Sequence, residues 1–135
     1  MGNAELRAMN KADLKHRTMR FGLEMIRLAE ALPKGRTEDV IGRQLVRSGT
    51  SVGANYRAAC RAKSTADFIS KMGTVEEETD ESMYWMELLV EAGVVESEKV
   101  RPLLQEANEL LAITVASIKT AKRQSNPKSA LRNPK

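Results

Sequence analysis

The 135-residue sequence contains few of the residues that most catalytic sites and β-folds require. Cys60 is the only cysteine and His16 the only histidine, which excludes an internal disulfide, a cysteine-based zinc site and a di-iron site of paired Glu-x-x-His motifs. Aromatic residues make up 4% of the chain, too few for a typical β-sandwich or barrel. No apolar run approaches the roughly 20 residues of a membrane span. We therefore expect a soluble, cytoplasmic protein that binds no membrane, metal or cofactor.

The residues that are abundant, among them Ala, Leu, Glu, Lys, Arg and Met, favour helices. Apolar side chains recur every three or four residues over about 13–32, 38–62, 65–92 and 99–123. Short connections separate these stretches, with Thr37 and Ser64 as expected N-caps and Gly93 as an expected C-terminal cap. The pattern predicts an all-α protein, an antiparallel up-down-up-down four-helix bundle over residues 13–123. Residues 1–12 are predicted to form an N-terminal extension and 124–135 a basic, disordered tail.

The second predicted helix is rich in small residues, including Gly42, Gly49 and Gly53. Each glycine costs up to about 1 kcal/mol relative to alanine in a helix, so close approach of another backbone is the expected reason for their presence. Two interpretations remain open at this point. Either the small residues only allow tight packing inside the chain, or this helix also meets a neighbouring subunit.

Charge is unevenly distributed along the chain, although the net charge is only +4. All charged side chains are basic between residues 40 and 66 and again from 119 to 135, whereas Lys71 is the only basic residue between 67 and 98. On the second predicted helix, four arginines share the face opposite the apolar one and span about 27 Å. We call these residues the arginine ridge: Arg43, Arg47, Arg57 and Arg61.

Arginine suits phosphate because its planar guanidinium donates two parallel hydrogen bonds. We therefore interpret the arginine ridge and the basic ends of the chain as a candidate RNA- or DNA-binding surface. Alternatives are a solvated face, or a partner for the acidic third helix of a neighbouring subunit in a protein-interaction scaffold. The candidate nucleic-acid-binding residues are Arg43, Arg47, Arg57, Arg61, Arg17, Arg20, Lys122 and Arg123.

No arrangement of residues points to an enzyme. The acidic run 75–81 offers weak Mg²⁺ ligands at most, and a solvent-facing or intersubunit acidic stripe is the preferred interpretation. Inward polar groups such as Ser51 and Asn55 leave a pocket as a remote option. We expect no catalytic residue, and we expect Trp85 to pack between helices or anchor an oligomer.

Four segments together resemble the bacterial four-helix-bundle proteins of the S23 type, known from intervening sequences in 23S ribosomal RNA genes. They are Gln44–Ala59, Lys63–Lys71, Glu76–Glu81 and Tyr84–Leu89. The resemblance covers roughly residues 15–123 and implies a small up-down bundle that assembles as a homopentamer. The family is similar to the accessory protein of diversity-generating retroelements, which binds nucleic acid and a reverse transcriptase. It thus implies RNA or DNA, further copies of the chain, and a reverse transcriptase or ribosomal component as partners.

Overall fold

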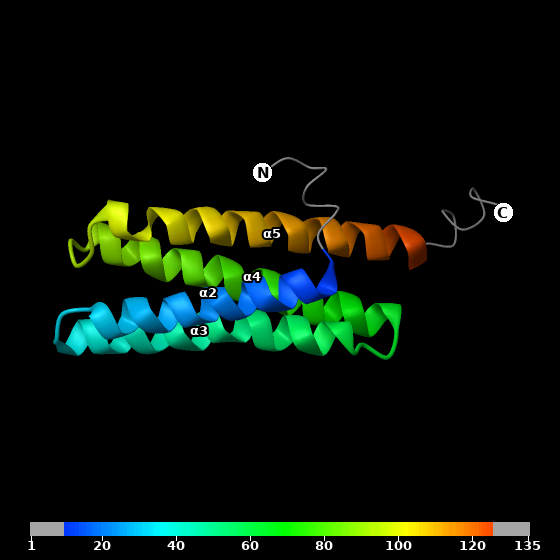
Figure 1. Ribbon diagram of the computed structural model, residues 1–135, viewed down its shortest axis with the longest axis horizontal. Coiled ribbons are helices and arrows are strands. Elements are labelled where there is room, and N and C mark those ends of the chain that lie inside the picture. The colour runs from blue at the N-terminus through cyan, green and yellow to red at the C-terminus, as the bar shows by residue number, and fades with distance from the viewer. Residues whose placement is uncertain (1–9, 126–135) are drawn as a thin grey trace.

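The computed structural model describes residues 10–125, and within this range the chain forms four α-helices and no strand. They are α2 (Lys11–Ala31), α3 (Arg36–Cys60), α4 (Thr65–Glu91) and α5 (Ser97–Ser125). The helices run alternately up and down the long axis of the molecule (Figure 1). The predicted antiparallel four-helix bundle is therefore confirmed, with bounds close to those predicted. The predicted extension and tail are wrong where the structure describes them, because residues 11–12 belong to α2 and residues 124–125 to α5. The rest of both predictions, over residues 1–9 and 126–135, lies outside the described residues.

The helix ends follow local capping chemistry. The Ser64 side chain accepts a hydrogen bond from the Asp67 amide at 3.0 Å, and Gly93 takes a positive φ of 75° just after α4, as predicted. The prediction of Thr37 as an N-cap was wrong, because α3 begins at Arg36 behind Gly35. Thr37 is thus already the second residue of the helix, and Gly35 takes the N-cap position without a side-chain hydrogen bond. Asn10, which sequence reasoning missed, forms a capping box with Asp13.

The core lies along the predicted apolar faces. Each helix contributes side chains that are almost fully buried, such as Phe21, Leu45, Met86 and Leu110. Buried hydroxyl groups are satisfied within the helices, since the Thr79 hydroxyl donates to the Val75 carbonyl at 2.7 Å. The regular spacing of these residues explains why four amphipathic helices close around one core. None of the four described helices is long and apolar enough to cross a membrane.

Neighbouring helices in the chain pack extensively, whereas α2 and α5 contact each other far less. One ionic cluster bridges these two helices. The Arg17 guanidinium, whose side chain is 17% exposed, donates to both carboxylate oxygens of Glu106 at 2.7 Å and to Glu109 at 2.6 Å. These hydrogen bonds raise the pKa of Arg17 above its ordinary value, against the opposing effect of burial.

The glycines of α3 face α2 of the same chain. A Cβ atom built on Gly49 would lie 2.6 Å from Met25 Cβ, and one on Gly53 would lie 3.3 Å from the Thr18 backbone. Both helices thus approach more closely than alanine would allow at Gly49. Close packing within the chain therefore explains the glycines at these two positions.

Candidate nucleic-acid interface

The arginine ridge faces outward along α3, as the periodicity predicts. All four arginines are exposed, as are Thr50 and Ala54 between them. Their electrostatic surroundings nevertheless differ along the helix. Arg43 donates to Asp39 at 3.0 Å, one turn earlier on the same helix. Such exposed pairs add little stability and leave the guanidinium accessible.

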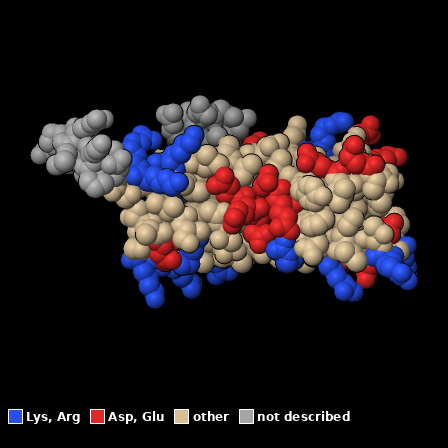
Figure 2. Space-filling model, turned by 180° about the vertical axis from the view of Figure 1, so that it is seen from behind, with Lys and Arg blue, Asp and Glu red and all other residues tan. Residues whose placement is uncertain are grey.

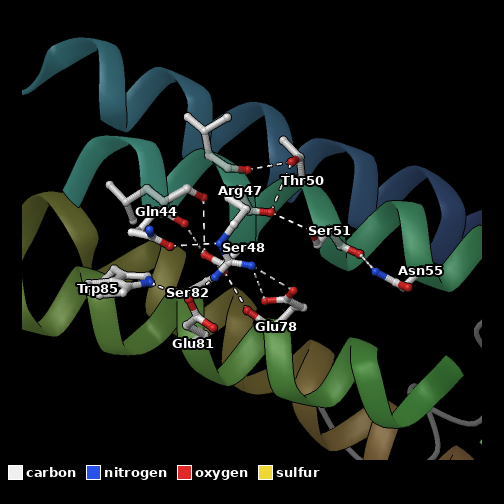
Figure 3. Close-up of polar contacts among 12 residues, drawn as sticks. Gln44, Arg47, Ser48, Thr50, Ser51, Asn55, Glu78, Glu81, Ser82 and Trp85 are labelled. Atoms are coloured by element: carbon white, nitrogen blue, oxygen red, sulfur yellow. Dashed lines mark hydrogen bonds and ion pairs between the residues drawn. The ribbon is translucent and has the colours of Figure 1, made fainter. Parts of the chain in front are cut away.

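Arg47 is held by carboxylates of the adjacent helix α4 (Figure 3). Its guanidinium donates to both oxygens of Glu78, at 3.1 and 3.2 Å, and to Glu81. The Trp85 indole also donates to Glu81 at 3.0 Å. Hydrogen bonds from Trp85 and Arg47 hold the pKa of Glu81 below its ordinary value, and the hydrogen bond to Glu81 contributes most to the raised pKa of Arg47. Arg47 therefore joins α3 to α4, and its charge is largely neutralised.

The C-terminal half of the ridge is different. Within the described chain, neither Arg57 nor Arg61 has a carboxylate within ion-pair distance, and both side chains are exposed. Arg20, Lys122 and Arg123 are also exposed and make no ion pair inside residues 10–125. The remaining candidate, Arg17, is already bonded to Glu106 and Glu109. The predicted site residues thus fall into a neutralised group and an uncompensated group.

Antiparallel topology gathers Arg57, Arg61, Lys122 and Arg123 of this uncompensated group at one end of the bundle, whereas Arg20 lies midway along α2. α3 and α5 both end there, and α2 and α4 both begin there (Figure 1). Figure 2, in which this end lies on the left, shows basic side chains above and below the body here and again at the opposite end, with acidic ones over the middle and at the upper right. We call this region the basic end and define it by Lys11, Lys15, Arg57, Arg61, Lys63, Lys119, Lys122 and Arg123.

Two described carboxylates lie near these cations. Asp13 takes part in the capping box at the start of α2, where its carboxylate accepts a hydrogen bond from the backbone N–H of Asn10. Asp67 bonds the Lys71 ammonium at 2.5 Å and accepts from the Lys63 amide, and these contacts lower its pKa. Because Asp67 is engaged with Lys71, it leaves the basic side chains of α3 and α5 without a counter-charge.

A groove of about 920 Å³ opens at the basic end, between the α3–α4 connection and α5. Its walls include the buried side chains of Leu14 and Ile113 and the half-buried ring of Phe68. Lys11 and Lys63 lie among the lining residues, together with hydroxyl and amide groups. The groove therefore combines an apolar interior with a positively charged rim, which sequence periodicity alone does not reveal.

The metal site and the polar pocket that the sequence left as options are not assembled among the described residues. Among the described residues no group of three or more His, Cys, Asp or Glu side chains is arranged to hold a metal ion. Ser51 donates to the Arg47 carbonyl at 2.7 Å, and Asn55 donates to the Ser51 carbonyl at 2.8 Å (Figure 3). These polar groups thus bond their own helix and do not line the groove.

The described chain is thus a four-helix bundle with an uncompensated basic end. Residues 10–116 match the family described as 23S rRNA-intervening sequence protein, and because this match spans most of the sequence, the chain belongs to that family. It is also similar to the crystal structure of a protein with unknown function from the S23 ribosomal protein family of Bacteroides thetaiotaomicron VPI-5482. The two share 32% identity at a TM-score of 0.76, covering 82% of this chain and 99% of that one. No protein of curated function matches significantly.

Proposed function

We propose that this protein is a non-enzymatic homo-oligomer that binds RNA or DNA through phosphate contacts made by its basic end. The observation that carries the proposal is the convergence of Arg57, Arg61, Lys122 and Arg123 at one end of the bundle, without ion pairs to the described chain. Cations held together repel one another, and a polyanion relieves that repulsion while releasing its own counterions.

The ridge contributes unequally in this proposal. Arg57 and Arg61 contact phosphates directly, whereas Arg47 serves mainly to join α3 to α4. Arg17 similarly fixes α2 against α5. Arg43 and Arg20 are also exposed, but Arg43 lies in the first half of α3 and Arg20 midway along α2, so both are outside the basic end. The names of the matched family and of the similar crystal structure, which refer to 23S rRNA and to ribosomal protein, are consistent with an RNA ligand.

Self-association is supported by apolar side chains left on the surface. Met19 and Leu23 of α2 are 61% and 43% exposed. The outer face of α5 carries a shallow, mainly apolar depression lined by Leu111 and Val115 among others. Exposed apolar patches mark protein interfaces. In the pentamer that the resemblance implies, the basic end would repeat around the symmetry axis, and several modest phosphate sites would act together.

A scaffold is the second candidate function, and one observation favours it. Glu77 and Asp80 on α4 are exposed, with no cation of the described chain within ion-pair distance. These carboxylates are available to Arg57 and Arg61 of a neighbouring subunit. In that arrangement the arginines hold the oligomer together and are not free to bind nucleic acid.

A charge-matched pair of variants tests the proposal. The first replaces the basic-end residues Arg57, Arg61, Lys122 and Arg123 by glutamine. The control makes the same replacement at exposed residues near the opposite end, Lys34, Arg36, Lys99 and Arg101. Binding of a labelled short RNA is measured by fluorescence anisotropy over a range of salt concentrations, with light scattering on the same samples.

We expect the basic-end variant to bind RNA weakly. The slope of the logarithm of the binding constant against the logarithm of the salt concentration should become shallower by about 3, since four phosphate contacts are lost and each contributes about 0.7–0.9. The control should keep most of its slope. Equal slopes in the two variants, or no binding by the unmodified protein at low salt, would refute the proposal. Dissociation of the basic-end variant into monomers would favour the scaffold.

A further inference from the structure

The groove at the basic end has a large volume and a partly apolar lining, and neither is needed for electrostatic binding of a phosphate backbone. Its volume of about 920 Å³ is large enough to admit a small organic group, and the groove is open to solvent and not an enclosed cavity. Its lining includes Leu14 and Ile113, which belong to the buried core, so part of its wall is apolar and offers more than a phosphate contact uses. An occupant that fits must therefore carry a flat or apolar portion as well as negative charge.

We infer that this groove receives an unpaired nucleotide, so that the protein prefers single-stranded nucleic acid to duplex; the inference rests on the proposed function. The Phe68 ring provides an aromatic surface within the groove, and stacking on such rings is how proteins commonly hold unpaired bases. Lys11 and Lys63 on the rim are placed to contact the flanking phosphates. A base inside a duplex is already stacked on both faces and cannot enter.

Polar groups along α5 complete the match to a nucleobase. Ser117, Thr120 and Gln124 line the groove, and their side chains make no hydrogen bond to the rest of the described chain. Their hydroxyl and amide groups can donate to and accept from base edges. Each can adapt to different bases by rotating, so recognition by this groove is tolerant of sequence.

The test compares one RNA sequence as a single strand and as a blunt duplex, at equal salt, by anisotropy. Electrostatic binding alone favours the duplex, because duplex has the higher charge density and the steeper salt dependence. We expect the unmodified protein to bind the single strand more tightly. Stacking of one base corresponds to about 5- to 150-fold in affinity, which sets the size of the preference.

Two variants alter the groove without touching the charges. Phe68→Leu keeps an apolar side chain but removes the aromatic ring, and Thr120→Leu places a larger side chain at an exposed lining position. Thr37→Leu makes the same change at an exposed helical position near the opposite end. We expect the first two to lose the single-strand preference while the control retains it. Because Thr120 is exposed, its variant remains informative even if Phe68→Leu affects folding.

Cys60 supplies an internal reporter, since it is the only cysteine of the chain and lines the groove. A saturating single strand should slow its reaction with a thiol reagent more than saturating duplex does. If both RNAs bind equally, or if the groove variants behave like the control, the inference is wrong while the proposed function stands. If neither RNA binds at low salt, both are wrong.

Discussion

The close approach of α2 and α3 predicts opposite effects for one substitution at two glycines. Gly49 packs against Met25, which is fully buried, and an added Cβ would lie 2.6 Å from Met25 Cβ and nearer still to its Cγ. At Gly73 of α4, an added Cβ would meet no atom within 4 Å beyond its chain neighbours and the nearby backbone of its own helix. Gly49→Ala must therefore displace a buried side chain or separate two helices, whereas Gly73→Ala only fills open space.

The magnitudes follow from two competing effects. Alanine gains about 0.5–1 kcal/mol over glycine within a helix, and this is the whole effect at Gly73. Overpacking a well-packed core costs about 1–3 kcal/mol. Because the Cβ of Met25 cannot rotate away as a side-chain end can, we expect the cost to exceed the gain at Gly49. Gly49→Ala should be less stable than the unmodified protein by about 0.5–2 kcal/mol.

Urea unfolding followed by circular dichroism measures both variants against the unmodified protein. The experiment is repeated at several protein concentrations, because the apparent stability of an oligomer depends on concentration. Gly49→Ala should unfold at lower urea at every concentration, and Gly73→Ala at higher urea. A Gly49→Ala protein as stable as the unmodified one would show that the glycine does not serve packing between α2 and α3. A loss of stability confined to low concentration would instead place Gly49 at a subunit interface.

Two further predictions concern the ionic contacts between helices. Arg47→Met should lower the free energy of unfolding by about 0.5–1.5 kcal/mol, because it leaves Glu78, which is only 16% exposed, without its cation. In the same urea assay, Arg43→Met removes only an exposed ion pair and should lower the free energy of unfolding by less than about 0.5 kcal/mol. Because the pKa of Glu81 is lowered in the folded protein, ionised Glu81 stabilises the fold fully above its ordinary pKa of 4.5. This stabilisation is lost as the pH falls through the folded pKa, so the melting temperature should drop on acidification. Arg47→Met should show a shallower drop. Equal acid sensitivity of the two proteins would contradict that assignment.

The fold could be predicted from the sequence because each helix repeats its apolar residues with a helical period. That period places Val52 and Met72 in the core and the arginine ridge on the outside, as the structure has them. The N-cap at Ser64 could be predicted, because a serine three residues before Asp67 is a known capping pattern. The pattern was missed at Asn10, although Asn10 and Asp13 have the same spacing as Ser64 and Asp67.

The site was less predictable, because helical period describes one helix at a time. It indicates which arginines share a face of α3, but not that Glu78 and Glu81 of α4 lie opposite Arg47. That register depends on how two helices slide along each other, which side-chain packing decides. The basic end had a detectable signal, since basic runs close two helices that an up-down topology brings to the same end. Grouping charges by helix end as well as by helix face would have found it.

Charged side chains serve different roles at different positions along the long axis of the bundle. In the middle, Arg47 pairs with carboxylates of α4 and Arg17 with carboxylates of α5, so cations and anions there hold neighbouring helices together. At the basic end, the exposed cations bridge no helices within the described chain, and their mutual repulsion is limited by a screening length of about 8–10 Å at physiological salt. Removing them should therefore cost no stability. Loss of RNA binding by a stably folded basic-end variant would then report directly on the ligand rather than on folding.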